Sequence, residues 1–387
     1  HDQPDRDDFK INIYNSVPKW ATGAVFYQVF PDRFAKSEYA DARELPEWAD
    51  KRNWSDKVKG HGAGVAQQFF GGDLKGIEEH LDHLKKIGAT VLYLTPFFPA
   101  FSNHRYDAAS FDEVDPLLGG NKALSSLVKS DHSMGLKVMG DLTANHSGDK
   151  HQWFVAAHKK PAAKESDFYY FTDRNTKYES WWGVPSLPKF NWNSSDLKDR
   201  FIRGKDSVVA KWLKAPYALD GWRIDVANMT GKIRDEDHST EVADSIRLTM
   251  SSVNPDSFLI GEFTSDAAES IQGKNYQAAM TYSNFTRPVW RWLWNQEVKT
   301  EENQIGPGRK GITAEQFREL HTSFASIFPW HVRLHNLNAL DTHDTGRFKT
   351  FAIPDSQRVA AGLQFTMPGI PMIFAGDEFG LEGENGE

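Results

Sequence analysis

Eight short runs of β-type apolar residues alternate with segments whose apolar residues recur at helical spacing. Repeated strand–helix units of this kind build parallel sheets, and eight of them close naturally into a barrel. We therefore predict a (β/α)₈ TIM barrel, an α/β fold. The expected strands are 24–30, 89–94, 136–141, 220–225, 258–262, 277–281, 337–340 and 370–374.

The segments between these runs show the spacing of amphipathic helices. In 76–86, for example, Ile77, Leu81 and Leu84 fall on one helical face. Such a face can pack on the outside of a barrel. The expected helices are 76–86, 123–133, 315–328 and 356–367.

One connection is far longer than the two to six residues usual in barrel loops. From 143 to about 193 the chain is polar, Lys-rich and aromatic, which predicts a subdomain inserted after the third strand. The predicted divisions are 1–142 for the first part of the barrel, 143–195 for the insertion and 196–387 for the second part of the barrel. The polar segment 41–59 is expected to be a second long loop.

Composition excludes several classes of function. The chain has 387 residues, a net charge of −8 and no Cys, so thiolate metal sites, disulfides and cysteine nucleophiles are absent from it. A nucleic-acid partner would need a clustered basic face, and a membrane span would need a run of about 20 apolar residues. The sequence shows neither feature, so we expect no nucleic-acid partner and no membrane partner. The 13 Trp residues can serve an aromatic core or form platforms for sugar rings, and composition alone does not separate the two.

Carboxylates follow four of the expected strands. Asp141 ends the third, Asp225 the fourth and Glu262 the fifth, while Asp344 follows the seventh. A single Asp at a strand end is usually a cap for the next helix. Four acids on different strands instead predict an active site at the C-terminal face of the barrel.

The spacing of Arg223 and Asp225 gives the acids distinct roles. Residues two apart on a strand share a face, so the guanidinium is expected to lower the pKa of Asp225 and keep it ionised; a structural ion pair is the alternative. Glu262 is expected to hold its proton as a general acid, favoured by burial near Asp225 and Asp344. Two such carboxyls about 5–5.5 Å apart would make a retaining glycosidase with a covalent intermediate.

These segments resemble the four short conserved regions of the α-amylase superfamily (glycoside hydrolase family 13), in the same order. The matching stretches are Asp141-x-x-x-Asn145-His146, Gly221-x-Arg223-x-Asp225, Gly261-Glu262 and His343-Asp344. The resemblance implies that Asp225 is the nucleophile, Glu262 the acid/base and Asp344 the stabiliser of the transition state. The substrate contacts that it implies are Tyr106, Asp141, His146, Arg223, His343 and Arg347.

Two motifs in and beside the insertion resemble different branches of this superfamily. The run Leu187-Pro188-Lys189-Phe190-Asn191 is similar to the M-P-K-L-N motif of cyclomaltodextrinases, maltogenic amylases and neopullulanases. The run 145–154 is more similar to oligo-1,6-glucosidases, and Met229 stands where the first group usually has Glu. The predicted activity is retaining hydrolysis of α-1,4-linked (cyclo)maltodextrins or related α-glucans.

Other activities stay open from the sequence. The alternatives are an oligo-1,6-glucosidase-like enzyme or a glucan transferase, with a non-catalytic carbohydrate-binding barrel as a remote one. Transglycosylation would need acceptor-site aromatics, for which Trp153, Trp181 and Trp182 are candidates.

The resemblance also implies parts that this chain lacks. Members carry a C-terminal β-sandwich after the barrel, so we expect a fragment, a homo-oligomer or a second chain that completes the fold. Calcium is common in the superfamily, and Asn145 is a candidate ligand, but the metal is left unassigned and no other cofactor is expected. The resemblance favours a cytoplasmic location, with secretion as the alternative.

Overall fold

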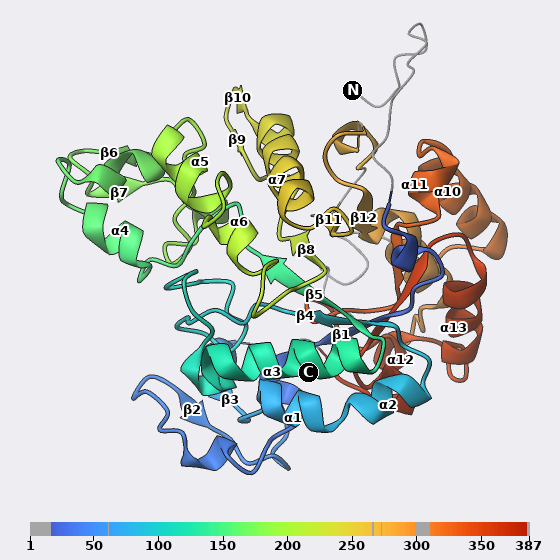
Figure 1. Cartoon of the computed structure of the whole chain (residues 1–387). Helices are drawn as coiled ribbons and strands as arrows, with labels where there is room; N and C mark the ends of the chain where they lie inside the picture. The colour runs from blue at the N-terminus through green and yellow to red at the C-terminus, as the bar shows by residue number, and fades with distance from the viewer. Residues whose placement is uncertain (1–16, 61, 265–266, 272, 299–309, 385–387) are drawn as a thin grey trace, which may run out of the picture.

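The computed structural model describes residues 17–60, 62–264, 267–271, 273–298 and 310–384. A closed barrel of eight parallel strands, in the order β1-β14-β13-β12-β11-β8-β5-β4, lies at its centre (Figure 1). Each expected strand matches one of these, so the predicted (β/α)₈ barrel is confirmed. The strands are β1 (Phe26–Val29), β4 (Val91–Leu94), β5 (Lys137–Leu142), β8 (Gly221–Ile224), β11 (Phe258–Phe263), β12 (Ala278–Thr281), β13 (Leu337–Ala339) and β14 (Ile370–Phe374).

Side chains that point into the barrel form layers. Because the side chains of a strand alternate between its two faces, every second residue points inward. The lower layers are apolar and include Phe26, Val91, Met139, Ile260 and Met372. Two residues further along β1, β4, β5 and β11, and at the inward position of β8, the side chains turn polar, at Gln28, Tyr93, Asp141, Glu262 and Arg223. The barrel therefore has a packed base and a polar mouth.

Helices cover the outside of the barrel, with α1, α2 and α3 on one side and α10, α12 and α13 on another (Figure 1). The helix predicted over 76–86 is instead two short helices, because His80 leaves the helical region at φ −115° and ψ 16°. Its Nδ1 lies 2.8 Å from the Gly76 carbonyl oxygen and caps that end. The helices are α1 (Leu74–Glu79), α2 (Leu81–Lys86), α3 (Gly120–Ser133), α4 (Gln152–Ala157), α5 (Ser195–Phe201), α6 (Val208–Lys211), α7 (Ser239–Val253), α8 (Arg287–Leu293), α10 (Ala314–Ser326), α11 (Trp330–Arg333), α12 (Phe348–Phe351) and α13 (Gln357–Thr366).

The long connection between β5 and β8 extends to one side of the barrel, where it carries α4 and the hairpin of β6 (Phe171–Thr172) and β7 (Lys177–Tyr178) (Figure 1). Trp153 packs edge-on against Phe168 at 5.5 Å and is only 8% exposed. The prediction that Trp153 is available for sugar stacking is therefore wrong, because this indole belongs to the aromatic core of the connection.

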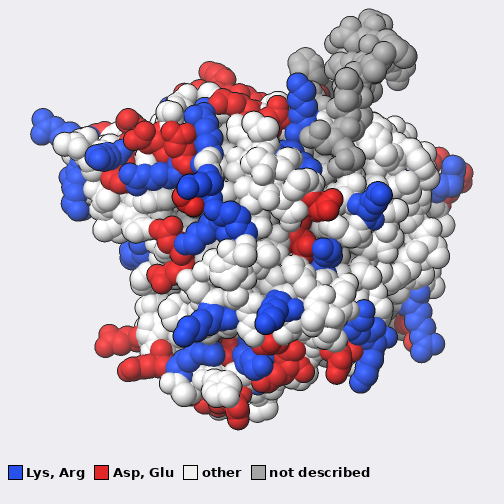
Figure 2. Space-filling view, in the orientation of Figure 1, with Lys and Arg blue, Asp and Glu red and all other residues white. Residues whose placement is uncertain are grey.

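The surface is mixed in charge. On the face seen in Figure 2, Lys and Arg side chains lie among Asp and Glu side chains, with large uncharged areas between them. Among the residues that the structure describes, none of the helices is long and apolar enough to cross a membrane.

Candidate active site

Strand register brings the predicted catalytic acids to the mouth of the barrel. Arg223 on β8 is level with Asp141 on β5 and with Ile260 on β11. Asp225 and Glu262 each lie two residues further along these neighbouring strands, so both point inward at the next level. Adjacent strands are about 4.8 Å apart, and the two carboxyl groups therefore face the same small space.

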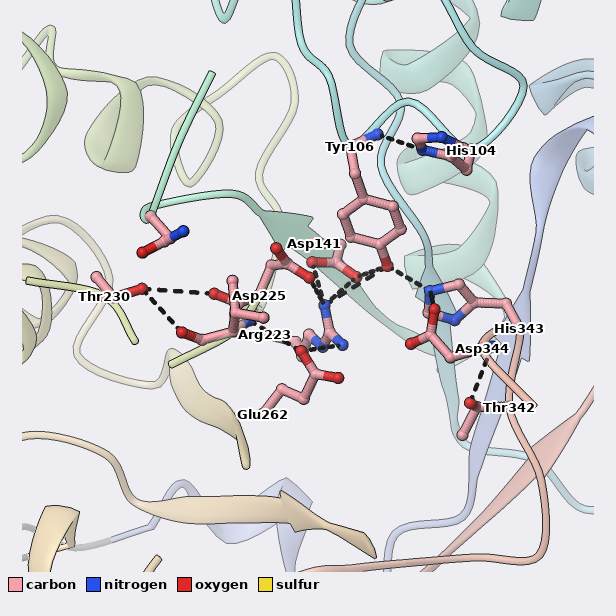
Figure 3. Close-up of polar contacts among 12 residues, drawn as sticks. His104, Tyr106, Asp141, Arg223, Asp225, Thr230, Glu262, Thr342, His343 and Asp344 are labelled. Atoms are coloured by element: carbon pink, nitrogen blue, oxygen red, sulfur yellow. Dashed lines mark hydrogen bonds and ion pairs between the residues drawn. The ribbon is translucent and has the colours of Figure 1, made fainter. Parts of the chain in front are cut away.

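Arg223 binds three of the acids (Figure 3). Its Nη1 lies 2.9 Å from Asp141 Oδ1 and 3.0 Å from Asp225 Oδ1, and its Nη2 lies 2.9 Å from Glu262 Oε2. Glu262 Oε2 is held by this ion pair and by a hydrogen bond from the backbone N–H of Val226, at 2.8 Å. Charge-assisted bonds of this kind fix geometry as well as contributing energy. One buried guanidinium thus orients the nucleophile and acid/base candidates relative to each other.

The pKa of Asp225 departs from the sequence-based expectation. Burial raises it well above its usual range, and the nearby Glu262, Asp141 and Asp344 add to this, while Arg223 only partly opposes it. The prediction of a lowered pKa is therefore wrong in its net direction. Sequence spacing revealed the Arg partner, but the loss of water and the surplus of acids around one cation depend on the three-dimensional packing.

A hydrogen-bonded chain fixes the protonation of His343. The Gln28 amide nitrogen lies 3.1 Å from His343 Nδ1, and Gln28 Oε1 accepts from the His343 backbone N–H at 3.4 Å. With the amide so oriented, Nδ1 is the acceptor and Nε2 carries the proton. His343 Nε2 lies 2.6 Å from Tyr106 Oη, whose hydroxyl donates to Asp141 Oδ2 at 2.8 Å (Figure 3). Burial lowers the pKa of His343 to about 3, so the ring is neutral at pH 7.

The third acid is the most accessible of the group. The Asp344 side chain is 48% exposed and lies 3.4 Å from His343 Nε2 through its Oδ1. On its other side, the Tyr282 hydroxyl lies 3.4 Å from Asp344 Oδ2 and 3.2 Å from Thr342 Oγ1. Asp344 can therefore meet a ligand while its carboxyl is held from within the barrel.

Two predicted substrate contacts lie away from Arg223. His146 is buried beside Asn145, with its ring 6.1 Å from that of Trp181. Arg347 pairs with Asp377 at 3.1 Å and donates to the Ala375 carbonyl oxygen at 2.8 Å. It lines a cavity of about 560 Å³ between the loops after β1 and β14. Its role as a substrate contact stays a prediction.

Asn145 does not offer a free oxygen to calcium. Its side-chain oxygen accepts a hydrogen bond from the Lys189 ammonium, which also donates to the Met229 carbonyl oxygen at 3.0 Å. The ammonium thus holds the position beside this oxygen that a cation would need. In the described part of the chain, no three His, Cys, Asp or Glu residues are grouped to hold a metal. These residues do not fit a calcium site, and Lys189 instead joins the insertion to the loops after β5 and β8.

Four residues of the site were not singled out from the sequence. Gln28 and Tyr282 position His343 and Asp344, as described above. Tyr93 donates to Asp141 Oδ2 at 2.6 Å, and His104 accepts from the Tyr106 backbone N–H at 3.1 Å. The usable signal for Gln28 and Tyr93 was a polar residue at an inward position near the end of an apolar strand.

The described geometry can be compared with known proteins. The model of the α-amylase catalytic domain matches residues 28–386. The chain belongs to the α-amylase family. A cyclomaltodextrinase from Bacillus sp. is 31% identical over 376 residues, covering 95% of this chain and 61% of the relative. Neopullulanase 2 from Thermoactinomyces vulgaris is also 31% identical, over 95% of this chain and 58% of its own length.

Solved structures with folds similar to that of this α-amylase family member include enzymes of the same kind. A cyclomaltodextrinase structure has a TM-score of 0.80 and 30% identity, covering 96% of this chain and 59% of that one. A cyclic α-maltosyl-(1→6)-maltose hydrolase from Arthrobacter globiformis has a TM-score of 0.79 and 27% identity, covering 96% and 77%. The chain thus spans about three fifths of the length of the cyclomaltodextrinases that it matches.

Proposed function

We propose that this chain is a retaining α-glucoside hydrolase that acts on α-1,4-linked (cyclo)maltodextrins or related α-glucans. The observation that carries the proposal is the single guanidinium of Arg223 bound to Asp141, Asp225 and Glu262 at the barrel mouth, with Asp344 exposed beside them. Relatives named cyclomaltodextrinase and neopullulanase support the choice of substrate class. The region 143–195 is proposed as an inserted subdomain at one side of this mouth.

In the first step, a carboxylate oxygen of Asp225 attacks the anomeric carbon and the glycosidic C–O bond breaks. Glu262 gives its proton to the leaving oxygen, and a glycosyl ester forms on Asp225. In the second step, water attacks the same carbon, Glu262 takes a proton from it, and Asp225 leaves. Two displacements at one carbon retain the α configuration.

The surrounding residues act on charge and position. Asp344 is proposed to bind sugar hydroxyls and favour the oxocarbenium-like transition state. Neutral His343 can donate from Nε2 to the sugar as well as to Tyr106. Tyr106, Asp141, His146 and Arg347 complete the proposed substrate contacts.

Three further points remain part of the proposal. A sugar hydroxyl that replaces water in the second step would give transglycosylation. An α-1,6 preference is a second alternative, and one structural neighbour is named as a hydrolase of cyclic α-maltosyl-(1→6)-maltose. A cytoplasmic location is proposed with one relative named an intracellular maltogenic amylase, from Bacillus subtilis. A homo-oligomer or a complex with a second chain is proposed as well.

The test is a product analysis on β-cyclodextrin, starch, pullulan and isomaltose, with NMR to follow the anomer first released. We expect α-anomeric maltose or glucose from β-cyclodextrin, and its loss in Asp225→Asn. Asp131→Asn, a carboxyl-to-amide change at a buried position on α3 away from the site, is the matched control and should retain activity. Release of the β anomer, or full activity in Asp225→Asn, would refute the proposed mechanism, and turnover of isomaltose alone would move the chain to the α-1,6 branch.

A further inference from the structure

Trp182 has an unusual setting for an indole. With 77% of its surface exposed, it is the most exposed large apolar side chain in the described part of the chain. Its backbone lies in the left-handed region, at φ 48° and ψ 28°, which bulky residues rarely adopt. Both the exposure and the backbone conformation cost free energy, and such costs are often kept where a side chain has a function.

The ring of Trp182 extends a line of rings that starts at the site. Its ring centroid lies 5.3 Å from that of Trp181 with an angle of 8° between the planes, so one face of Trp182 is covered and its exposure lies on the other side. The Trp181 ring lies 6.1 Å from the ring of His146, one of the predicted substrate contacts. The line therefore runs from the site to solvent.

The backbone around these two indoles is held in place. Ser180 pairs with Pro188 in an isolated bridge, and Trp181 N–H donates to the Leu187 carbonyl oxygen at 3.0 Å. Lys189, next along this segment, pairs in turn with His146. A ring surface fixed in this way loses little conformational entropy when a ligand covers it.

We propose that the open face of Trp182, backed by Trp181, is a platform on which glucose rings of a long α-glucan stack outside the cleavage site. The apolar face of a pyranose can pack flat on an indole, which offers a large rigid surface with few rotatable bonds. The platform makes the enzyme favour glucans long enough to reach Trp182. This inference rests on the proposed α-glucan hydrolase activity and adds a preference for chain length.

The test compares kcat/KM on maltotriose and maltoheptaose in the wild type, Trp182→Ala, Trp182→Phe and Trp330→Ala. Trp330, 59% exposed on α11, is the matched control and should leave both values unchanged. We expect Trp182→Ala to lower the ratio of the maltoheptaose to the maltotriose value about tenfold, and Trp182→Phe to keep most of it because an aromatic face remains. An unchanged ratio in Trp182→Ala would overturn the platform.

A binding measurement separates this inference from the proposed activity. Calorimetric titration of maltoheptaose into Asp225→Asn and into Asp225→Asn/Trp182→Ala requires no turnover. If the wild type hydrolyses neither sugar, the proposed function fails, and weaker binding in the double variant still supports the platform. Equal affinities, or no binding to either protein, would refute it.

Discussion

Replacing Asp131 is expected to stabilise the protein increasingly as the pH rises. Asp131 lies near the end of α3, is 0% exposed, and neither of its carboxyl oxygens has a hydrogen-bond partner. The acids that face it are Asp220, which accepts from His132 and Lys137, and Glu78, which accepts from two Ser hydroxyls and a Lys. Burial, followed by the charges of Asp220 and Glu78, raises the pKa of Asp131 to about 8.

The sign and size of the effect follow from proton linkage. Below pH 3.8, the ordinary pKa, Asp131 is protonated in both the folded and the unfolded chain, so its titration does not change the free energy of unfolding. Between pH 3.8 and about 8 only the folded chain holds the proton, so the free energy of unfolding falls by up to about 1.4 kcal/mol for each pH unit. The cost reaches about 4 kcal/mol at pH 7 and levels off above pH 8.

Asp131→Asn removes the titration and keeps the shape. Urea unfolding followed by Trp fluorescence at pH 5, 6 and 7 should show a stability difference, variant minus wild type, that grows by about 2–3 kcal/mol over this range. Asp82→Asn, at an exposed position on α2, is the control and should show no such growth. A difference that stays constant with pH would refute the reasoning, since a pH-independent gain cannot come from the carboxyl's proton.

Three further outcomes are expected. Arg223→Lys should raise the pKa of Asp225 further, because an ammonium cannot bridge the acids. Since Asp225 must be ionised to attack, the acidic limb of the pH profile of kcat/KM should move to higher pH. An unmoved limb would contradict this. Gln28→Leu should lower kcat about tenfold or more with a smaller change in KM, because His343 loses the donor that fixes its tautomer. Equal kcat values for the variant and the wild type in steady-state assays would count against this prediction. Lys189→Met should lower the free energy of unfolding by about 2–4 kcal/mol, because the buried Asn145 oxygen and the half-buried Met229 carbonyl oxygen lose their donor. A chelator should leave the wild-type melting temperature unchanged, and a chelator-induced drop would restore the case for a metal.

The barrel and the position of the acids at its mouth were predictable because both follow from local patterns. Apolar runs at regular intervals specify parallel strands, and the carboxyl ends of parallel strands meet at one face. The pair Arg223 and Asp225 needed only a period of two to be placed on one side of β8. The placement of Asp225 level with Glu262 depends on the register of β8 against β11, which no pattern within either strand reveals.

Features that depend on packing were mistaken or missed. Trp153 and Trp182 belong to the same aromatic connection, yet one is 8% and the other 77% exposed. The split of the helix at His80 comes from a ring that caps the Gly76 carbonyl, a contact that apolar spacing does not encode. In each case the outcome depends on contacts made in the folded chain, which the spacing of apolar residues does not encode.

Buried carboxyl groups at the two ends of the barrel show how the fold separates stability from chemistry. At the base, Asp131 precedes β5 and has no cation partner. Its carboxyl lowers the free energy of unfolding at neutral pH, and replacement by Asn should remove that loss. At the mouth, Asp141, Asp225 and Glu262 are also buried, yet they share Arg223, so removing one acid would disturb the charge balance of the others. Asp131 should therefore tolerate amide substitution and the acids that share Arg223 should not, although the pKa of Asp131 and that of Asp225 are both raised by burial. The shared guanidinium, more than the raised pKa, distinguishes Asp141, Asp225 and Glu262 from Asp131.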